Sequence, residues 1–342
     1  MKKQFKTLIP KLAEAVDVKA GELVLLHFWG ENEDLDVVDA FAVEIAKQGA
    51  IPVKWQQSRL YTKDWFAAAN PESLELPEAY FNIFKAADTV IDLCMYMPPA
   101  PHKDFPQERM NEYRGFMMKL FQSLTEGKEK FIQIRIPTEE TAAMAGMSLE
   151  EYGPLVMDAM DVDYGQMKQN AKDMIKQFDN VKEVAIETGD HKLTFSIDNR
   201  PWQEDHGIGD FPAGEVYLAP IEESANGSIA FPVAFVEGRK VEDLTLTFEN
   251  GVVTQCSDSE LAEMIKECPG PSDRIGEFGI GLNPKVTQQT GYALLDEKQI
   301  GTVHIALGMN TMYGGQNDTP LHMDFVVAPS RVVLNNDSEL AL

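Results

Sequence analysis

Two side chains near the C-terminus have types and a spacing that suit metal binding. His322 and Asp324 lie in the run 321–327, which predicts a β-strand. Because strand side chains alternate between the two faces of a sheet, His322 and Asp324 share one face and Met323 lies on the other. A neutral imidazole and a carboxylate placed in this way can chelate a divalent ion. The same pair also occurs as a hydrogen-bonded couple or on a surface, so the motif is not specific by itself.

Three further residues are candidate ligands by their type and setting. His304 lies in a second apolar strand at 301–308, Glu215 opens the strand-like run 215–219, and Glu277 lies in the glycine-rich segment 275–281. A buried carboxylate is costly unless it has a proton, a partner or a metal ion. Taken alone, the histidine also fits a hydrogen-bonded core residue, and each glutamate fits an exposed turn. Together, the two histidines and three carboxylates suit one or two divalent ions.

The first half of the chain alternates apolar strand-like runs with helical patterns. Strands are predicted at 23–28, 51–55, 89–94 and 130–136, and helices at 35–48, 76–86 and 108–124. This alternation predicts an α/β domain whose parallel sheet is covered by helices. Residues 148–178 predict a long helical region that begins at a Ser148–Glu151 capping box and restarts at Gly153-Pro154.

From about residue 181, short alternating runs separated by Gly, Asn and Asp turns replace this pattern. The predicted elements are strands at 181–187, 192–197, 215–219, 228–236, 244–248 and 252–255, a hairpin turn at Asn250-Gly251 and a helix at 259–268. We therefore expect two domains. Residues 1–182 form the α/β domain, and residues 183–342 form a mainly antiparallel α+β domain that carries the candidate ligands.

Composition and missing motifs exclude several classes of protein. The 342 residues include 30 basic and 55 acidic side chains, a net charge of −25, so nucleic-acid binding is not expected. No GxGxxG or GxxxxGK[ST] motif follows a predicted strand. Three cysteines without a CxxC pair argue against a disulfide scaffold and fit a reducing compartment. No run approaches the roughly 20 apolar residues of a membrane span. We expect a cytoplasmic protein without a membrane partner.

The ordered motifs of the second half resemble the thermophilic metallo-aminopeptidase family, of the aminopeptidase T and aminopeptidase S type. The similar segments are 211–220 around Glu215, 276–281 around Glu277, 296–308 with His304, and the triplet 322–324. In the first half, the likeness is limited to the α/β pattern.

This resemblance implies a homodimeric metallo-aminopeptidase that removes N-terminal residues from short peptides. It implies a two-metal site, of zinc, cobalt or manganese, whose ligands are Glu215, Glu277, His304, His322 and Asp324. The ions would activate a water molecule for attack on the peptide bond. Glu277 or Glu215 would also carry the proton to the leaving amine.

One position departs from the family pattern and leaves alternatives open. Members carry a tyrosine seven residues after the first ligand histidine, where this chain has Thr311. The nearby Tyr313 either replaces that catalytic tyrosine or is a turn aromatic. The ring-cleaving dioxygenases of the dihydroxypyridine type resemble the same family and would hold one Fe(II) through His304, His322 and Asp324. The other alternative is a non-catalytic metal-binding homologue.

Overall fold

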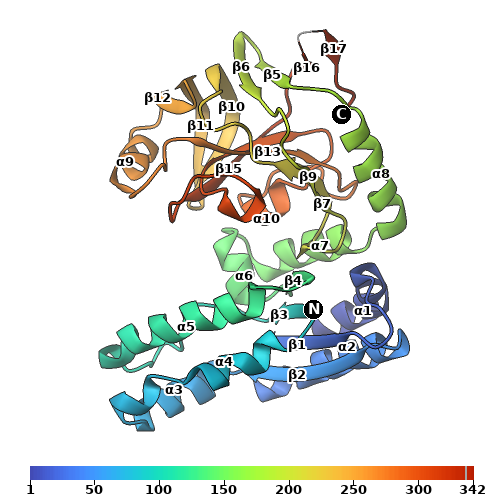
Figure 1. Ribbon diagram of the computed structural model, residues 1–342, viewed down its shortest axis with the longest axis vertical. Helices are drawn as coiled ribbons and strands as arrows, with labels where there is room; N and C mark the ends of the chain where they lie inside the picture. The colour runs from blue at the N-terminus through green and yellow to red at the C-terminus, as the bar shows by residue number, and fades with distance from the viewer. Residues whose placement is uncertain (336) are drawn as a thin grey trace. The chain divides into compact units, whose positions relative to one another are not determined.

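Figure 1 shows the computed structural model of the chain, in which residues 1–335 and 337–342 are described. Contacts divide these residues into two compact units. The first comprises residues 1–143, 147–161 and 207–212, and the second comprises 144–146, 162–206 and 213–342. The second unit contains all the candidate ligands.

The first unit contains a parallel sheet, sheet A, with strand order β2-β1-β3-β4-β8. Its strands are β1 (Leu23–Trp29), β2 (Ile51–Gln57), β3 (Thr89–Cys94), β4 (Lys130–Arg135) and β8 (Asp210–Phe211). Its helices are α1 (Lys2–Val16), α2 (Leu35–Lys47), α3 (Arg59–Ala68), α4 (Glu78–Lys85), α5 (Met110–Thr125), α6 (Glu139–Met144) and α7 (Leu149–Met160), with 3₁₀ turns η1 (Asn32–Asp34), η2 (Pro71–Leu74) and η3 (Gln107–Arg109). Strand β3 is buried along its whole length, as expected for a central parallel strand.

The helical region after residue 148 differs from the prediction at its break. The capping box is present, but α7 continues through Pro154 and ends at Met160. The next helix, α8 (Tyr164–Lys176), begins after Asp163, whose side chain accepts a hydrogen bond from the Gln166 backbone N–H. The new N-cap at Asp163, rather than Pro154, therefore sets the break. Among the described residues, no helix combines the length and the apolar character that crossing a bilayer requires.

The second unit contains two antiparallel sheets, and its mainly antiparallel architecture with the parallel sheet A confirms the predicted fold class. Sheet B has the order β12-β11-β10-β6-β5-β16-β17, and sheet C has the order β15-β14-β13-β9-β7. The strands of sheet B are β5 (Glu183–Thr188), β6 (His191–Ser196), β10 (Asn226–Val236), β11 (Arg239–Glu249), β12 (Val252–Cys256), β16 (Arg331–Leu334) and β17 (Ser338–Glu339). Those of sheet C are β7 (Gln203–Asp205), β9 (Glu215–Leu218), β13 (Ile275–Gly281), β14 (Val303–Gly308) and β15 (His322–Val327), and the unit also has α9 (Ser259–Glu267), α10 (Ala293–Asp296) and η4 (Thr311–Tyr313).

One hydrophobic core joins sheets B and C. It contains Phe195 and Phe231 from sheet B together with Phe278 and Phe325 from sheet C. The ring pairs Phe195–Phe278 and Phe231–Phe325 have centroids 5.2 and 5.6 Å apart. Because side chains alternate along each strand, the face of sheet C opposite this core is free to carry polar residues.

Candidate metal centre

Sheet C places all the predicted ligands on its face opposite the core. Paired residues of neighbouring strands have side chains on the same face, as do residues two apart along one strand. The relevant pairs are Glu277–Ala306, Ala306–Asp324, Gly308–His322, Gly279–His304 and Gly281–Glu215. The separate segments that carried the sequence motifs are therefore brought together by strand register.

A β-bulge turns Glu277 toward this face. Ile275 pairs with Leu307 in the core, whereas Glu277 pairs with Ala306, so the register shifts between them. Without the extra residue, Glu277 would lie beside Ile305 on the core face. The glycine-rich segment is thus a buried strand and not an exposed turn.

Glu277 lies between the two histidines. Its Oε1 is 3.1 Å from His304 Nε2, and its Oε2 is 3.6 Å from His322 Nε2. Glu215 Oε2 is 3.4 Å from His304 Nε2, and Asp324 Oδ2 is 3.5 Å from His322 Nε2. Ligand atoms that share one tetrahedral ion at about 2.1 Å lie about 3.4 Å apart, so these separations fit metal binding. Two candidate groups result, Glu215–Glu277–His304 and Glu277–His322–Asp324.

Several polar side-chain atoms of the cluster are buried and have no hydrogen-bond partner. Within the described chain these include Glu215 Oε2, Asp324 Oδ1 and His304 Nδ1. A buried carboxylate oxygen without a donor carries a desolvation penalty that a cation can offset. The residues therefore fit divalent ions on two independent grounds, their spacing and their unpaired oxygens.

In the metal-free protein, protons supply the positive charge. Burial alone would lower the pKa of His304, but Glu277 and Glu215 raise it to about 9. Burial opposes protonation of His322 as well, yet Asp324 and Glu277 raise its pKa to about 10. Burial also raises the pKa of Glu215. Metal binding would displace the histidine protons, because an imidazole nitrogen binds a metal only when deprotonated.

His322 is oriented by a backbone carbonyl. Its Nδ1 lies 2.8 Å from the carbonyl oxygen of Met309 and 3.1 Å from the hydroxyl of Tyr313. A carbonyl only accepts, so in the neutral ring Nδ1 carries the proton and Nε2 directs its lone pair toward the carboxylates. The Tyr313 hydroxyl also donates to the same carbonyl at 3.1 Å. Thr311 is exposed, so Tyr313 is the residue of this turn that lies beside the cluster.

Gly279 provides the space that the His304 ring occupies. A Cβ built on Gly279 would lie 2.0 Å from His304 Nε2. Any side chain there would displace the ring, so a glycine is required beside this histidine.

Lys298 and Glu297 extend the cluster and are not among the predicted residues. The Lys298 ammonium donates to Glu215 Oε1 at 2.5 Å and to Glu297 Oε1 at 2.7 Å. It also lies 3.8 Å from Asp205 Oδ2, and its side chain is only 1% exposed. In the sequence, Glu297 and Lys298 belong to the charged run 296–298, which lies directly before an apolar strand. An exposed loop explains such a run equally well, so the pattern does not predict a buried cluster.

A cavity of about 500 Å³ opens beside the cluster in the second unit. Its lining includes His322 and Asp324 together with Phe235, Tyr292 and Met323. The His322 side chain is 27% exposed, whereas that of Asp324 is 8% exposed. A small substrate can therefore reach the centre from the His322 side. Imidazoles and carboxylates at the wall of such a cavity suit metal-assisted chemistry.

A model of the thermophilic metalloprotease family, M29, matches residues 6–335. The chain belongs to this family. As an M29 protein it is a metallopeptidase, a hydrolase of peptides that depends on divalent metal ions. The match confirms the resemblance predicted from the motifs of the second half.

Two solved structures share the fold of this M29 chain. AmpT from Thermus thermophilus has a TM-score of 0.69 at 16% identity, covering 96% of this chain and 95% of its own. The 2,5-dihydroxypyridine dioxygenase from Pseudomonas putida KT2440 has a TM-score of 0.65 at 16% identity, covering 100% and 96%. At such identity the likeness concerns the fold alone. A comparison with curated protein sequences found no match.

Proposed function

We propose that the protein is an aminopeptidase that releases N-terminal residues from short peptides with the help of two divalent metal ions. The main supporting observation is the position of Glu277, whose two oxygens face two different histidines. One ion would be held by Glu215, Glu277 and His304, and the other by Glu277, His322 and Asp324. This donor set accepts zinc, cobalt or manganese. The shared fold with AmpT also supports an aminopeptidase.

Charge balance in the cluster supports two ions. The buried carboxylates around Lys298 outnumber its ammonium group by five to one, and the excess of four negative charges equals the charge of two divalent ions. These carboxylates are Asp205, Glu215, Glu277, Glu297 and Asp324. Burial and neighbouring carboxylates raise the pKa of Glu297, although Lys298 opposes this shift. Because uncompensated buried charge is costly, two divalent ions suit the cluster better than one.

The protein's own residues have separate tasks in this proposal. Bound ions would supply an acidified water molecule and polarise the peptide carbonyl. Glu277 or Glu215 would carry the proton of that water to the leaving amine. Burial and Glu277 raise the pKa of Tyr313, so its hydroxyl remains a hydrogen-bond donor beside His322.

The test is the metal content per chain, measured on protein purified without chelator, together with hydrolysis of leucyl-p-nitroanilide by the same sample. We expect about two divalent ions per chain and turnover that is abolished in His322→Ala. His191→Ala is a matched control, because His191 lies in the same unit but bonds to Ser228 Oγ at 2.9 Å. It should keep both metal and activity. Protein that binds no divalent metal would contradict the proposal.

A further inference from the structure

The loop that follows β14 is held by a buried polar network outside the candidate metal centre. Asn310 and Asn317 are at most 3% exposed. Asn310 Oδ1 accepts from the Asn317 backbone N–H at 2.8 Å, and the Asn310 carbonyl accepts from the N–H groups of Tyr313 and Gly315 at 3.2 and 3.0 Å. Asn317 Nδ2 donates to the carbonyls of Ile275 and Gly308, both at 3.0 Å. These bonds define the path of residues 310–317.

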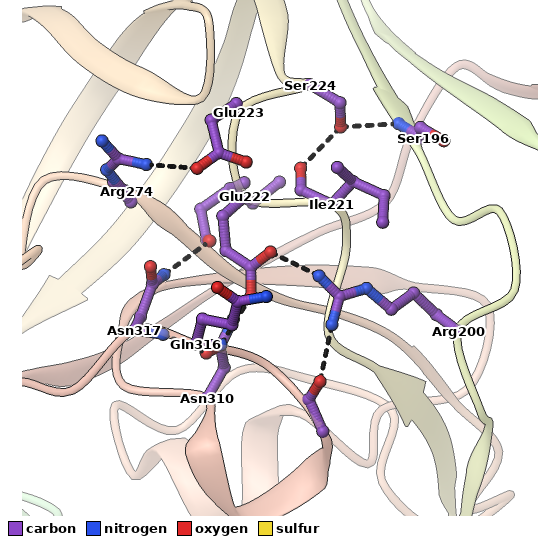
Figure 2. Close-up of polar contacts among 12 residues, drawn as sticks. Ser196, Arg200, Ile221, Glu222, Glu223, Ser224, Arg274, Asn310, Gln316 and Asn317 are labelled. Atoms are coloured by element: carbon purple, nitrogen blue, oxygen red, sulfur yellow. Dashed lines mark hydrogen bonds and ion pairs between the residues drawn. The ribbon is translucent and has the colours of Figure 1, made fainter.

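A buried ion pair between the β6–β7 and β9–β10 connections also holds this loop. Figure 2 shows Glu222 between Arg200 and the loop, with Arg200 Nη2 paired to Glu222 Oε2. Arg200 Nη1 donates to the carbonyl of Gly314 at 2.6 Å. Glu222 Oε1 accepts from the Gln316 backbone N–H at 2.7 Å and from Asn310 Nδ2 at 3.3 Å. The two side chains are 11% and 5% exposed, so water competes little for these bonds.

The fastened loop carries two groups that touch His322. These are the Met309 carbonyl, 2.8 Å from His322 Nδ1, and the Tyr313 hydroxyl, 3.1 Å from the same nitrogen. Met309 directly precedes Asn310, whose side chain contacts Glu222 and whose carbonyl accepts from the Tyr313 N–H. A shift of the loop would therefore move both partners of His322 together.

We propose that Arg200 and Glu222 are positioning residues for the metal centre. They fix the loop so that the Met309 carbonyl orients the His322 ring and the Tyr313 hydroxyl lies beside it. Hydrogen bonds to the second nitrogen of a metal-binding histidine set its orientation and basicity. A buried ion pair is weak evidence for stability, so its value here lies in the geometry that it imposes. The proposal rests on metal binding at His322, as in the proposed function, but not on peptide hydrolysis.

The test compares two ion pairs that Figure 2 shows close together. Arg200→Met/Glu222→Gln removes both buried charges and leaves neither uncompensated. Arg274→Met/Glu223→Gln is the matched control, because that pair, at 2.9 Å, is 33% and 67% exposed. Co²⁺ affinity is measured by competition with a chelator, and folding by thermal unfolding. We expect the first variant to lose about 10- to 100-fold in affinity for at least one Co²⁺ ion. The control should keep the affinity of the parent protein.

Parental Co²⁺ affinity in the folded Arg200→Met/Glu222→Gln protein would overturn the proposal, as would an equal loss in the control. If the double variant does not fold, the Co²⁺ affinity of Arg200→Lys tests the proposal instead. Lysine keeps the charge but lacks the planar fork that reaches both Gly314 and Glu222, so affinity should still fall by about tenfold. Unchanged affinity in Arg200→Lys would likewise overturn the proposal. Absence of peptide hydrolysis in the parent protein would contradict the proposed function and leave these affinity measurements intact.

Discussion

Each of the two compact units buries a histidine beside a carboxylate, and the surroundings of the two pairs differ. In sheet A, His27 Nδ1 lies 2.7 Å from Asp92 Oδ1, and both side chains are fully buried. Trp29 Nε1 donates to the same oxygen at 2.6 Å, and Gln133 Nε2 donates to the other oxygen at 2.8 Å. Trp29 and Gln133 thus donate to the two oxygens of Asp92, and this carboxylate is satisfied without a cation. Among the described residues, the atom of the pair that lacks a hydrogen-bond partner is His27 Nε2, on the imidazole rather than on the carboxylate.

In sheet C, carboxylates surround the histidine instead. His304 Nε2 faces Glu277 at 3.1 Å and Glu215 at 3.4 Å. Within the described residues, Glu215 Oε2 and Asp324 Oδ1 lack any hydrogen-bond donor. The comparison teaches that a buried histidine–carboxylate pair is not by itself a sign of a metal site. The informative feature is an excess of buried acceptors that only a cation can satisfy.

Among the variants that test this comparison, Glu277→Gln should produce the largest effect. An amide keeps the shape of Glu277 but not its negative charge, so both candidate groups lose the carboxylate that they share. We expect reduced metal content and a rate of leucyl-p-nitroanilide hydrolysis lower by about 10³-fold or more. Metal analysis and initial rates check this. Parental metal content and rate in Glu277→Gln would show that the two groups do not depend on a common ligand.

Gly279→Ala should produce the next largest effect. The added Cβ would meet His304 Nε2 and displace the ring, so Co²⁺ affinity should fall by about 10- to 100-fold. Gly115→Ala is the control, since a Cβ on this α5 glycine meets no atom within 4 Å. Chelator competition on both variants measures the difference. Equal affinities would mean that the ring tolerates a side chain beside it.

Asp92→Asn, in the sheet A pair, should lower the stability of the protein and leave metal binding unchanged, whereas the substitutions in sheet C should weaken metal binding. Removing the charge of Asp92 weakens its hydrogen bonds to His27, Trp29 and Gln133, so the free energy of unfolding should fall by about 1–3 kcal/mol. Metal content and hydrolysis should not change. Urea denaturation and metal analysis test both statements. Loss of metal in the folded variant would refute a purely structural role for the sheet A pair.

The smallest expected effect is the change in stability of the metal-free protein with pH. The pKa values of His304 and His322 are raised to about 9 and about 10, above the 6.5 of an unperturbed histidine. The folded state therefore binds these protons more tightly than the unfolded chain. The resulting stability is fully present below about pH 6.5 and is lost as the pH rises through 9 and 10. Calorimetry of chelator-treated protein should show a lower Tm at pH 10 than at pH 6.5. His322→Ala should show a smaller decrease, and an identical one would contradict the assignment.

Much of the fold was predictable because it depends on local patterns. The apolar runs of the first half form strands of a parallel sheet, and Asn250 and Gly251 form the β11–β12 turn with φ values of 51° and 84°. Both residues adopt the left-handed region that a two-residue hairpin turn favours. The predicted restart at Pro154 is wrong, because α7 continues through Pro154 and the side chain of Asp163 caps the start of α8.

The candidate site was predictable only in part. Periodicity alone placed His322 and Asp324 on one face, and the structure has their side chains 3.5 Å apart. Lys298 escaped prediction, since a charged residue before a strand is normally exposed. Arg200 and Glu222 escaped it as well, because their sequence neighbourhoods are ordinary polar turns. Their proposed role arises from contacts with a loop 94 and 114 residues further along the chain.

The sequence by itself determined the candidate ligands and the common face of His322 and Asp324, because residue type and alternation along a strand are local properties. Only the tertiary structure decided that Glu277 belongs with them. Its side chain reaches the ligand face through a bulge, and a bulge exists only relative to the partner strand. The same holds for the unsatisfied oxygens of Glu215 and Asp324. Whether a buried carboxylate lacks a donor depends on every chain segment that packs around it, and no single segment carries that information.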